Sequence, residues 1–163
     1  MLNFFTRGQL NQYCSIRDGE QRLGQALNLP DPALNLAEQL AQSKAEGCRF
    51  VLLGVPEDIG PRANLGLGGA DKGWTAFLSK FVNLQSNHFI AAGQILLLGE
   101  ILCADLQQQA STLDISQPLQ LSQLRQLVEV LDHRVASVVQ AIFNAGLLPV
   151  VIGGGHNNSY PII

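Results

Sequence analysis

Three short apolar runs divide this chain, and each is bounded by glycine or proline or contains glycine near its end. They read CRFVLLGVP at 48–56, QILLLGEIL at 94–102 and LLPVVIGGG at 147–155. None alternates apolar with polar residues, which is typical of strands covered on both faces, and such strands are usually parallel. We therefore predict three buried strands in a parallel sheet, the second of them breaking at Gly99 and Glu100.

Stretches with helical periodicity separate these runs. Residues 31–46 predict one helix, with Pro32 suited to its first turn and Gly47 to its end. Residues 57–70 hold too many glycines for a regular element, so we expect a long loop there. Residues 70–83 then predict a second helix, although a glycine lowers its helical propensity.

The clearest helix is predicted over 119–145, where apolar residues recur at spacings of three and four. Such spacing could also suit a coiled coil, but Leu127 and Val139 widen the apolar stripe, which favours packing on a sheet. The stripe consists of Leu121, Leu124, Val128, Leu131, Val135, Val138 and Ile142. The alternation of helices and strands predicts an α/β layered fold with right-handed crossovers.

Composition limits the size and the partners of this fold. With 163 residues, 47% of them hydrophobic and 14% charged, the chain can bury one ordinary core, so residues 1–163 predict a single domain in which 1–30 is an N-terminal extension. A net charge of -3 without basic clusters argues against nucleic acid or an anionic membrane as partner. No signal sequence or membrane-spanning run is present, so we expect a cytoplasmic protein.

The unusual sequence of this chain follows the predicted strands. In a parallel sheet the loops that leave the carboxyl ends of the strands share one edge, and ligands bind there. Residues 57–70, Gly99–Glu100 and Gly153–Asn158 all fall at that edge. We therefore expect them to converge on one site.

His156 is the candidate functional residue of this edge. The glycines before it match neither nucleotide-binding pattern, G-x-G-x-x-G or G-x-x-x-x-G-K-[ST], and the G-x-S-x-G elbow of a serine hydrolase is missing. Imidazole is the commonest side-chain metal ligand, so His156 is a candidate ligand; spacing alone equally allows a histidine bound to a loop backbone. We interpret His88 and His133 as surface histidines, and Cys14, Cys48 and Cys103 as plain thiols.

Two motifs together resemble the ureohydrolases, the family of arginases, agmatinases and formimidoylglutamases. DIGPRANLGLGGA at 58–70 is similar to the loop after the first strand of that family, and VVIGGGHNN at 150–158 is similar to its G-G-x-H segment after a central strand. Asn64 is among the matching residues, and Arg62 matches the variant typical of formimidoylglutamase-like members. The resemblance covers about residues 48–163.

The resemblance implies a three-layer α/β/α fold with an arginase-like parallel sheet, of which this chain holds an incomplete part. It implies an enzyme with two manganese ions that hydrolyses a C–N bond of a linear amidine or guanidine, and assembly into homo-oligomers. In such a centre the two ions would lower the pKa of a bound water and so supply a hydroxide for attack on the amidine carbon. His156 is then a manganese ligand, and Asn64 and Arg62 contact the small-molecule substrate; no other catalytic residue is assigned.

Three departures from the family pattern refine this expectation. Leu67 stands where many members have arginine, so the charged contact or salt bridge of those members is not expected here. Gly155 stands where arginases and agmatinases often have aspartate, which favours conversion of formimidoylglutamate to glutamate and formamide over arginase or agmatinase activity. The D-x-H-x-D and D-x-D segments that supply the other metal ligands do not occur in these residues. We therefore expect the chain to be an N-terminal portion that is inactive by itself.

A second hypothesis from another class stays open. The chain could be a non-catalytic α/β domain that associates with a second copy through the exposed edge of its sheet.

Overall fold

Four strands form one mixed sheet in the order β1-β3-β2-β4. The computed structural model describes residues 1–162 of the chain. The central strand β2 runs parallel to both β3 and β4, as predicted, whereas β1 pairs antiparallel with the outer side of β3. The prediction of a wholly parallel sheet is therefore wrong at one edge. The prediction of three buried strands is wrong at the other edge, because β4 has only one neighbouring strand and its residues are exposed or half-buried. The strands are β1 (Leu2–Phe4), β2 (Phe50–Gly54), β3 (Ile95–Ile101) and β4 (Leu148–Ile152).

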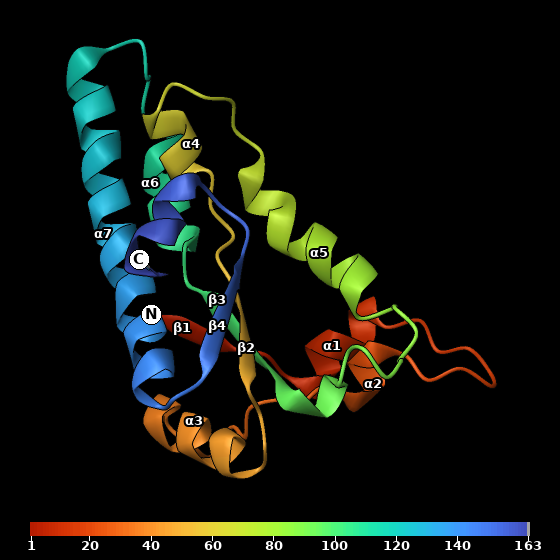
Figure 1. Ribbon diagram of the computed structural model, residues 1–163. Helices are drawn as coiled ribbons and strands as arrows, with labels where there is room; N and C mark the ends of the chain where they lie inside the picture. The colour runs from red at the N-terminus through yellow and green to blue at the C-terminus, as the bar shows by residue number, and fades with distance from the viewer. Residues whose placement is uncertain (163) are drawn as a thin grey trace.

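Helices cover both faces of this sheet (Figure 1). One face packs against α3 (Leu36–Ala45), α4 (Ile59–Ala63), α6 (Ala104–Ser111) and α7 (Pro118–Asn144). The other packs against α1 (Arg7–Tyr13), α2 (Leu23–Ala26) and α5 (Gly73–Phe81). Short 3-10 segments complete the chain: η1 (Ala70–Lys72), η2 (Ala92–Gln94) and η3 (His156–Ile162).

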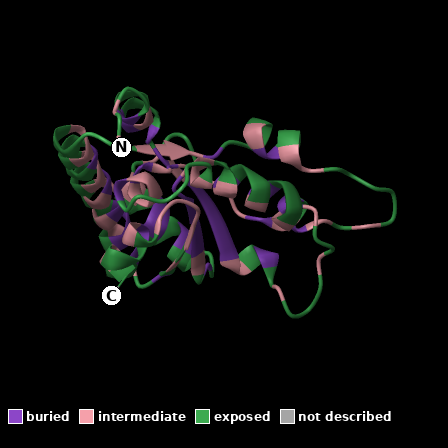
Figure 2. Cartoon of the chain, turned by 90° about the horizontal axis from the view of Figure 1, so that it is seen from above, coloured by how far each residue is buried: buried purple, intermediate pink, exposed green. Residues whose placement is uncertain are grey.

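The strands alternate their side chains between two hydrophobic cores. In β2, Val51 and Leu53 face the α7 side, while Leu52 faces the α5 side together with Trp74. Buried residues accordingly line the sheet in Figure 2, with exposed residues on the outer surfaces of the helices. This arrangement confirms the α/β class.

The longest helix, α7, packs on the sheet as the width of its apolar stripe predicted. Leu124, Leu131, Val135 and Ile142 are fully buried in the same core as β2 and β3. Gly146 follows the C-cap residue Ala145 with a positive φ of 69° and turns the chain toward β4, as expected for a glycine at a helix end.

Two boundaries differ from the sequence prediction. Helix α3 begins at Leu36 rather than near Pro32, because Asn35 and Glu38 form a capping box: the Asn35 side chain accepts from the Glu38 N–H at 3.1 Å, and the Glu38 carboxylate accepts from the Asn35 N–H at 3.0 Å. The predicted loop at 57–70 contains the short helix α4, whose Ile59 and Ala63 are buried.

Strand β3 continues through Gly99 and Glu100, where a break was predicted. The register against β2 shifts there, since Leu97 pairs with Leu52 and Gly99 with Leu53, so one extra residue is accommodated as a bulge. Gly99 has a φ of 148°, and a Cβ at this position would overlap the backbone of Asn3 in β1. The glycine therefore permits β1 to pair with a bulged strand.

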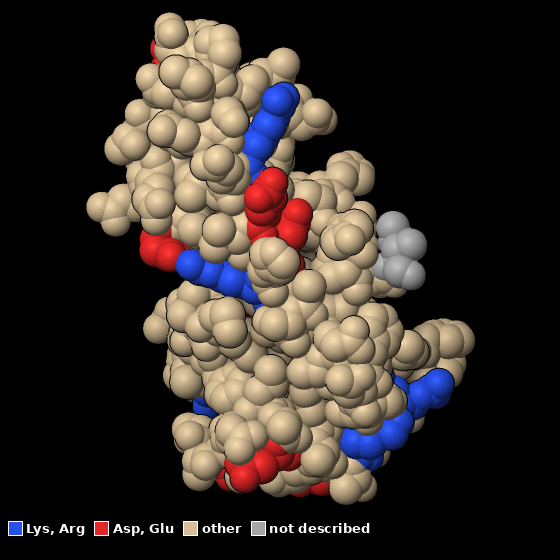
Figure 3. All heavy atoms as spheres, turned by 90° about the vertical axis from the view of Figure 1, so that its left-hand side faces the viewer, with Lys and Arg blue, Asp and Glu red and all other residues tan. Residues whose placement is uncertain are grey.

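Residues 1–30 join the domain rather than lying beside it. They supply β1 and the helices α1 and α2, and Phe5, Leu10 and Leu23 are buried in the core on the α5 side. None of the helices that the structure describes is long and apolar enough to cross a membrane. On the face formed by α7, basic and acidic side chains are few and interspersed (Figure 3).

Candidate functional site

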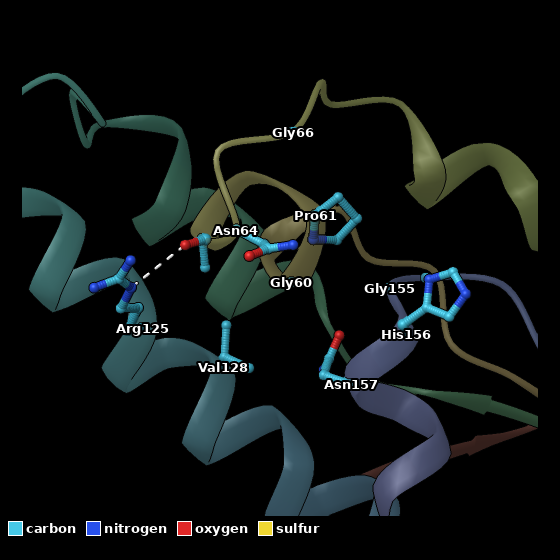
Figure 4. A pocket seen from close by; sticks show the side chains of 11 residues that line it. Gly60, Pro61, Asn64, Gly66, Arg125, Val128, Gly155, His156 and Asn157 are labelled. Carbon is cyan, nitrogen blue, oxygen red and sulfur yellow. Dashed lines mark hydrogen bonds between the residues drawn. The ribbon is translucent and has the colours of Figure 1, made fainter.

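The carboxyl ends of β2 and β4 lie side by side and open into a cavity of about 530 Å³. As predicted, the segment after β2 and the segment after β4 meet there, and the middle of α7 closes the third side (Figure 4). Gly99 and Glu100 do not reach it, because they remain inside β3 and pair with β1. The lining residues are Gly60, Pro61, Ala63, Asn64, Gly66, Arg125, Val128, Gly154, Gly155, His156 and Asn157.

A buried carboxylate joins the two strand-exit segments. Glu57, the third residue after β2, is 0% exposed. Its Oε2 accepts from the Gly60 N–H at 2.8 Å, and its Oε1 accepts from the Gly155 N–H and from the Asn158 Nδ2 at 2.9 Å. Hydrogen bonds to an ionised group are stronger than neutral ones, so Glu57 holds the backbone before His156 against the start of α4.

Asn157 fixes the same segment to α7. Its Nδ2 donates to Asp132 Oδ1 at 2.7 Å, while its Oδ1 lies so close to Gly60 and Gly155 that a Cβ on either glycine would overlap it. The absence of a side chain at both glycines therefore allows Asn157 to lie this close to their backbone. Burial raises the pKa of the Asp132 carboxyl, and the hydrogen bond from Asn157 partly offsets this effect.

His156 lies at the start of η3 and is exposed. It lines the cavity, but its imidazole ring points away from Asn64 and Arg125 (Figure 4). Its carbonyl accepts from Ser159 Oγ at 2.6 Å, so the backbone here is held while the ring is accessible. The side chain is thus neither sealed among apolar residues nor remote from the 57–70 segment. His88 and His133 are exposed elsewhere.

The structure brings Asn64 to the cavity and leaves Arg62 outside its lining. The Arg62 guanidinium donates to the Ala110 carbonyl of α6 at 2.8 Å and lies 3.8 Å from Asp58 Oδ1. Asp58 in turn accepts from the Gly69 N–H at 3.0 Å. Asp58 and Arg62 therefore shape the loop that carries Asn64. Leu67 is 93% exposed at the tip of that loop.

Among residues 1–162, no group of three or more His, Cys, Asp and Glu side chains is placed to hold a metal ion. Glu57 is fully engaged by its three donors, and Asp132 is bound to Asn157. These residues do not by themselves fit a centre of two manganese ions, because His156 can provide only one ligand.

The three cysteines are free thiols. Burial, and after it the negative charge of Glu57, raises the pKa of Cys103 to about 12, and burial is also the main cause that raises the pKa of Cys48. Neutral, buried thiols are poor nucleophiles. Cys48 and Cys103 therefore add no reactive group to the site.

Sequence reasoning missed Glu57 and Arg125. An acidic residue directly after a buried strand was the available signal for Glu57, since such a position lies at the ligand-binding edge. Arg125 carried no signal, because it stands among exposed polar residues of a helix and only the packing of α4 beside α7 brings it to the cavity.

Comparison with known protein families found no family that matches the chain, and comparison with curated proteins found no match.

Proposed function

We propose that this chain belongs to a manganese-dependent hydrolase of linear amidines, and that its preferred reaction converts N-formimidoyl-L-glutamate and water into L-glutamate and formamide. The observation that carries the proposal is the meeting of both ureohydrolase-like segments at one cavity, with an accessible imidazole at position 156 and Asn64 on the opposite wall. Gly155, where arginases and agmatinases often have aspartate, favours the formimidoyl substrate over arginine or agmatine.

The described residues would divide the work of such a site as follows. His156 would supply one metal ligand, since its imidazole is accessible at the start of η3. Glu57, which binds the Gly155 N–H, and Asn157, which binds Asp132, would fix the backbone on either side of this ligand. Asn64 would contact the substrate. The remaining ligands would have to come from outside these 163 residues.

The test compares the 163-residue chain with the protein encoded by the complete natural reading frame, each saturated with manganese. We expect the chain alone to be inactive and the complete protein to release formamide from N-formimidoyl-L-glutamate. His156→Asn in the complete protein should lower the rate by roughly 100-fold or more, because the metal site loses a ligand. The matched control His133→Asn changes an exposed histidine on α7 and should leave the rate unchanged.

Two results would overturn the proposal. One is a complete reading frame that contains no further metal-ligand segment. The other is a manganese-saturated complete protein that releases no formamide, urea or ammonia from formimidoylglutamate, agmatine or arginine.

One observation favours the alternative of a non-catalytic domain that associates with itself. Strand β4 pairs only with β2 among the strands that the structure describes, and its Leu148 and Val150 are 50% and 36% exposed. An edge strand with exposed apolar side chains is a template for pairing with another chain.

A further inference from the structure

Of the described side chains that line the cavity, Arg125 is the one with a permanent charge. No Asp or Glu is among the lining residues, so the positive charge is not neutralised within the wall. The neighbours of Arg125 along the lining are Asn64 and Val128. The cavity therefore combines a cationic end with a neutral interior.

Arg125 is exposed, and its guanidinium makes one hydrogen bond to the described residues. Its Nε donates to the Ala63 carbonyl, at the end of α4, over 3.4 Å (Figure 4). Its two terminal nitrogens form no hydrogen bond or ion pair with any residue from 1 to 162. Arg134, by contrast, donates from both terminal nitrogens to the Asp105 carboxylate, at 2.7 Å and 2.6 Å.

A guanidinium with both terminal nitrogens free is suited to bind a carboxylate through two parallel hydrogen bonds. Arg125 projects from α7, and His156 lies across the cavity on η3, with the Asn64 side chain between them (Figure 4). An elongated ligand could thus place an anionic group at Arg125 while its other end reaches the His156 side.

We propose that Arg125 anchors the carboxylate of the ligand. This inference rests on the proposed function and narrows it: the substrates are amidines that carry a carboxylate, such as formimidoylglutamate, and decarboxylated amidines such as agmatine are excluded. Arg125 acts here as a specificity-determining residue, with Asn64 as the second polar contact.

The first experiment needs no metal and no turnover. We would titrate the 163-residue chain with L-glutamate and follow its backbone amides by NMR. Saturable shifts are expected at Asn64, Gly66 and Gly154–His156, and 1,4-diaminobutane, a cation, should produce none. Arg125→Gln should weaken L-glutamate binding by about 10- to 100-fold, because charge-assisted hydrogen bonds are lost.

Two further variants separate recognition from loss of structure. Arg125→Lys keeps the positive charge but cannot form the two parallel hydrogen bonds of a guanidinium, so this variant should bind L-glutamate with intermediate affinity. Arg17→Gln removes an exposed arginine from the loop between α1 and α2 and should change nothing. Absence of saturable shifts in the unmodified chain, or equal binding by Arg125→Gln, overturns the inference.

The complete enzyme distinguishes failure of this inference from failure of the proposed function. Arg125→Gln should raise KM for formimidoylglutamate far more than it lowers kcat. If the Arg125→Gln variant hydrolyses formimidoylglutamate with an unchanged KM, Arg125 does not bind the carboxylate, and the proposed reaction is unaffected. If L-glutamate binds through Arg125 but the complete protein hydrolyses no amidine, the role of Arg125 is supported and the proposed reaction is wrong.

Discussion

Glu57 shows at the scale of one residue how this site is built. A charged side chain is rarely fully buried unless its oxygens are all bonded, and here two main-chain N–H groups and one amide satisfy it. No Lys or Arg pairs with it among the described ion pairs. The carboxylate therefore links two loops that are about a hundred residues apart in the sequence.

Replacing Glu57 should be costly for stability. Glu57→Ala leaves Gly60 N–H, Gly155 N–H and Asn158 Nδ2 without their acceptor, so we expect a loss of about 3 kcal/mol in the free energy of unfolding, measured by urea denaturation. Glu129→Ala, which removes an exposed glutamate from α7, is the matched control and should change stability by less than about 0.5 kcal/mol. Equal midpoints for the two variants would contradict the role given to Glu57.

The sequence could predict where the cavity lies but not how its residues divide the work. Glycine-rich segments after two apolar strands indicated the edge, and His156 and Asn64 do line one cavity. Arg62 could not be placed, because its partner Ala110 belongs to a different helix and the pairing depends on how α4 packs on α6. Arg125 could not be predicted either, because it reaches the cavity only through the packing of α4 beside α7.

At the scale of elements, the predictions that the structure confirms are those of helices and strands with a strong apolar pattern. The strands β2 and β4 follow from continuous apolar runs and the helix α7 from apolar periodicity, and packing then reinforces both signals. The start of α3 did not follow from Pro32, since the Asn35 capping box gives a better helix start. Strand β1 was missed because three residues are too few to show a period.

The bulge at Gly99 supplies the test at this scale. Gly99→Ala forces an L side chain into a φ of 148° and against the Asn3 backbone, so the free energy of unfolding should fall by roughly 2–4 kcal/mol. Gly93→Ala is the control, because a Cβ there would meet nothing within 4 Å and no positive φ is involved. Amide exchange of β1 should accelerate in the first variant only. Slow exchange in both would mean that β1 tolerates another pairing.

At the scale of the whole molecule, β4 forms an edge of the sheet with exposed apolar side chains. If this edge pairs with a second copy, sedimentation velocity of the 163-residue chain should show concentration-dependent association, and Leu148→Lys should shift it to monomer, since charge on an edge strand blocks pairing. Leu67→Lys alters another exposed leucine, in the loop after α4, and should leave association unchanged. A chain that stays monomeric at every concentration would exclude the self-associating alternative.

The cavity draws its walls from residues near 60, 125 and 155, which come together only when the entire domain is assembled. An unfolded chain has no such enclosure, so any small molecule that occupies it acts as a pharmacological chaperone and raises the melting temperature, by an amount that grows with the logarithm of the ratio of its concentration to its Kd. Thermal-shift screening of metabolites can therefore reveal the natural occupant before any reaction has been observed.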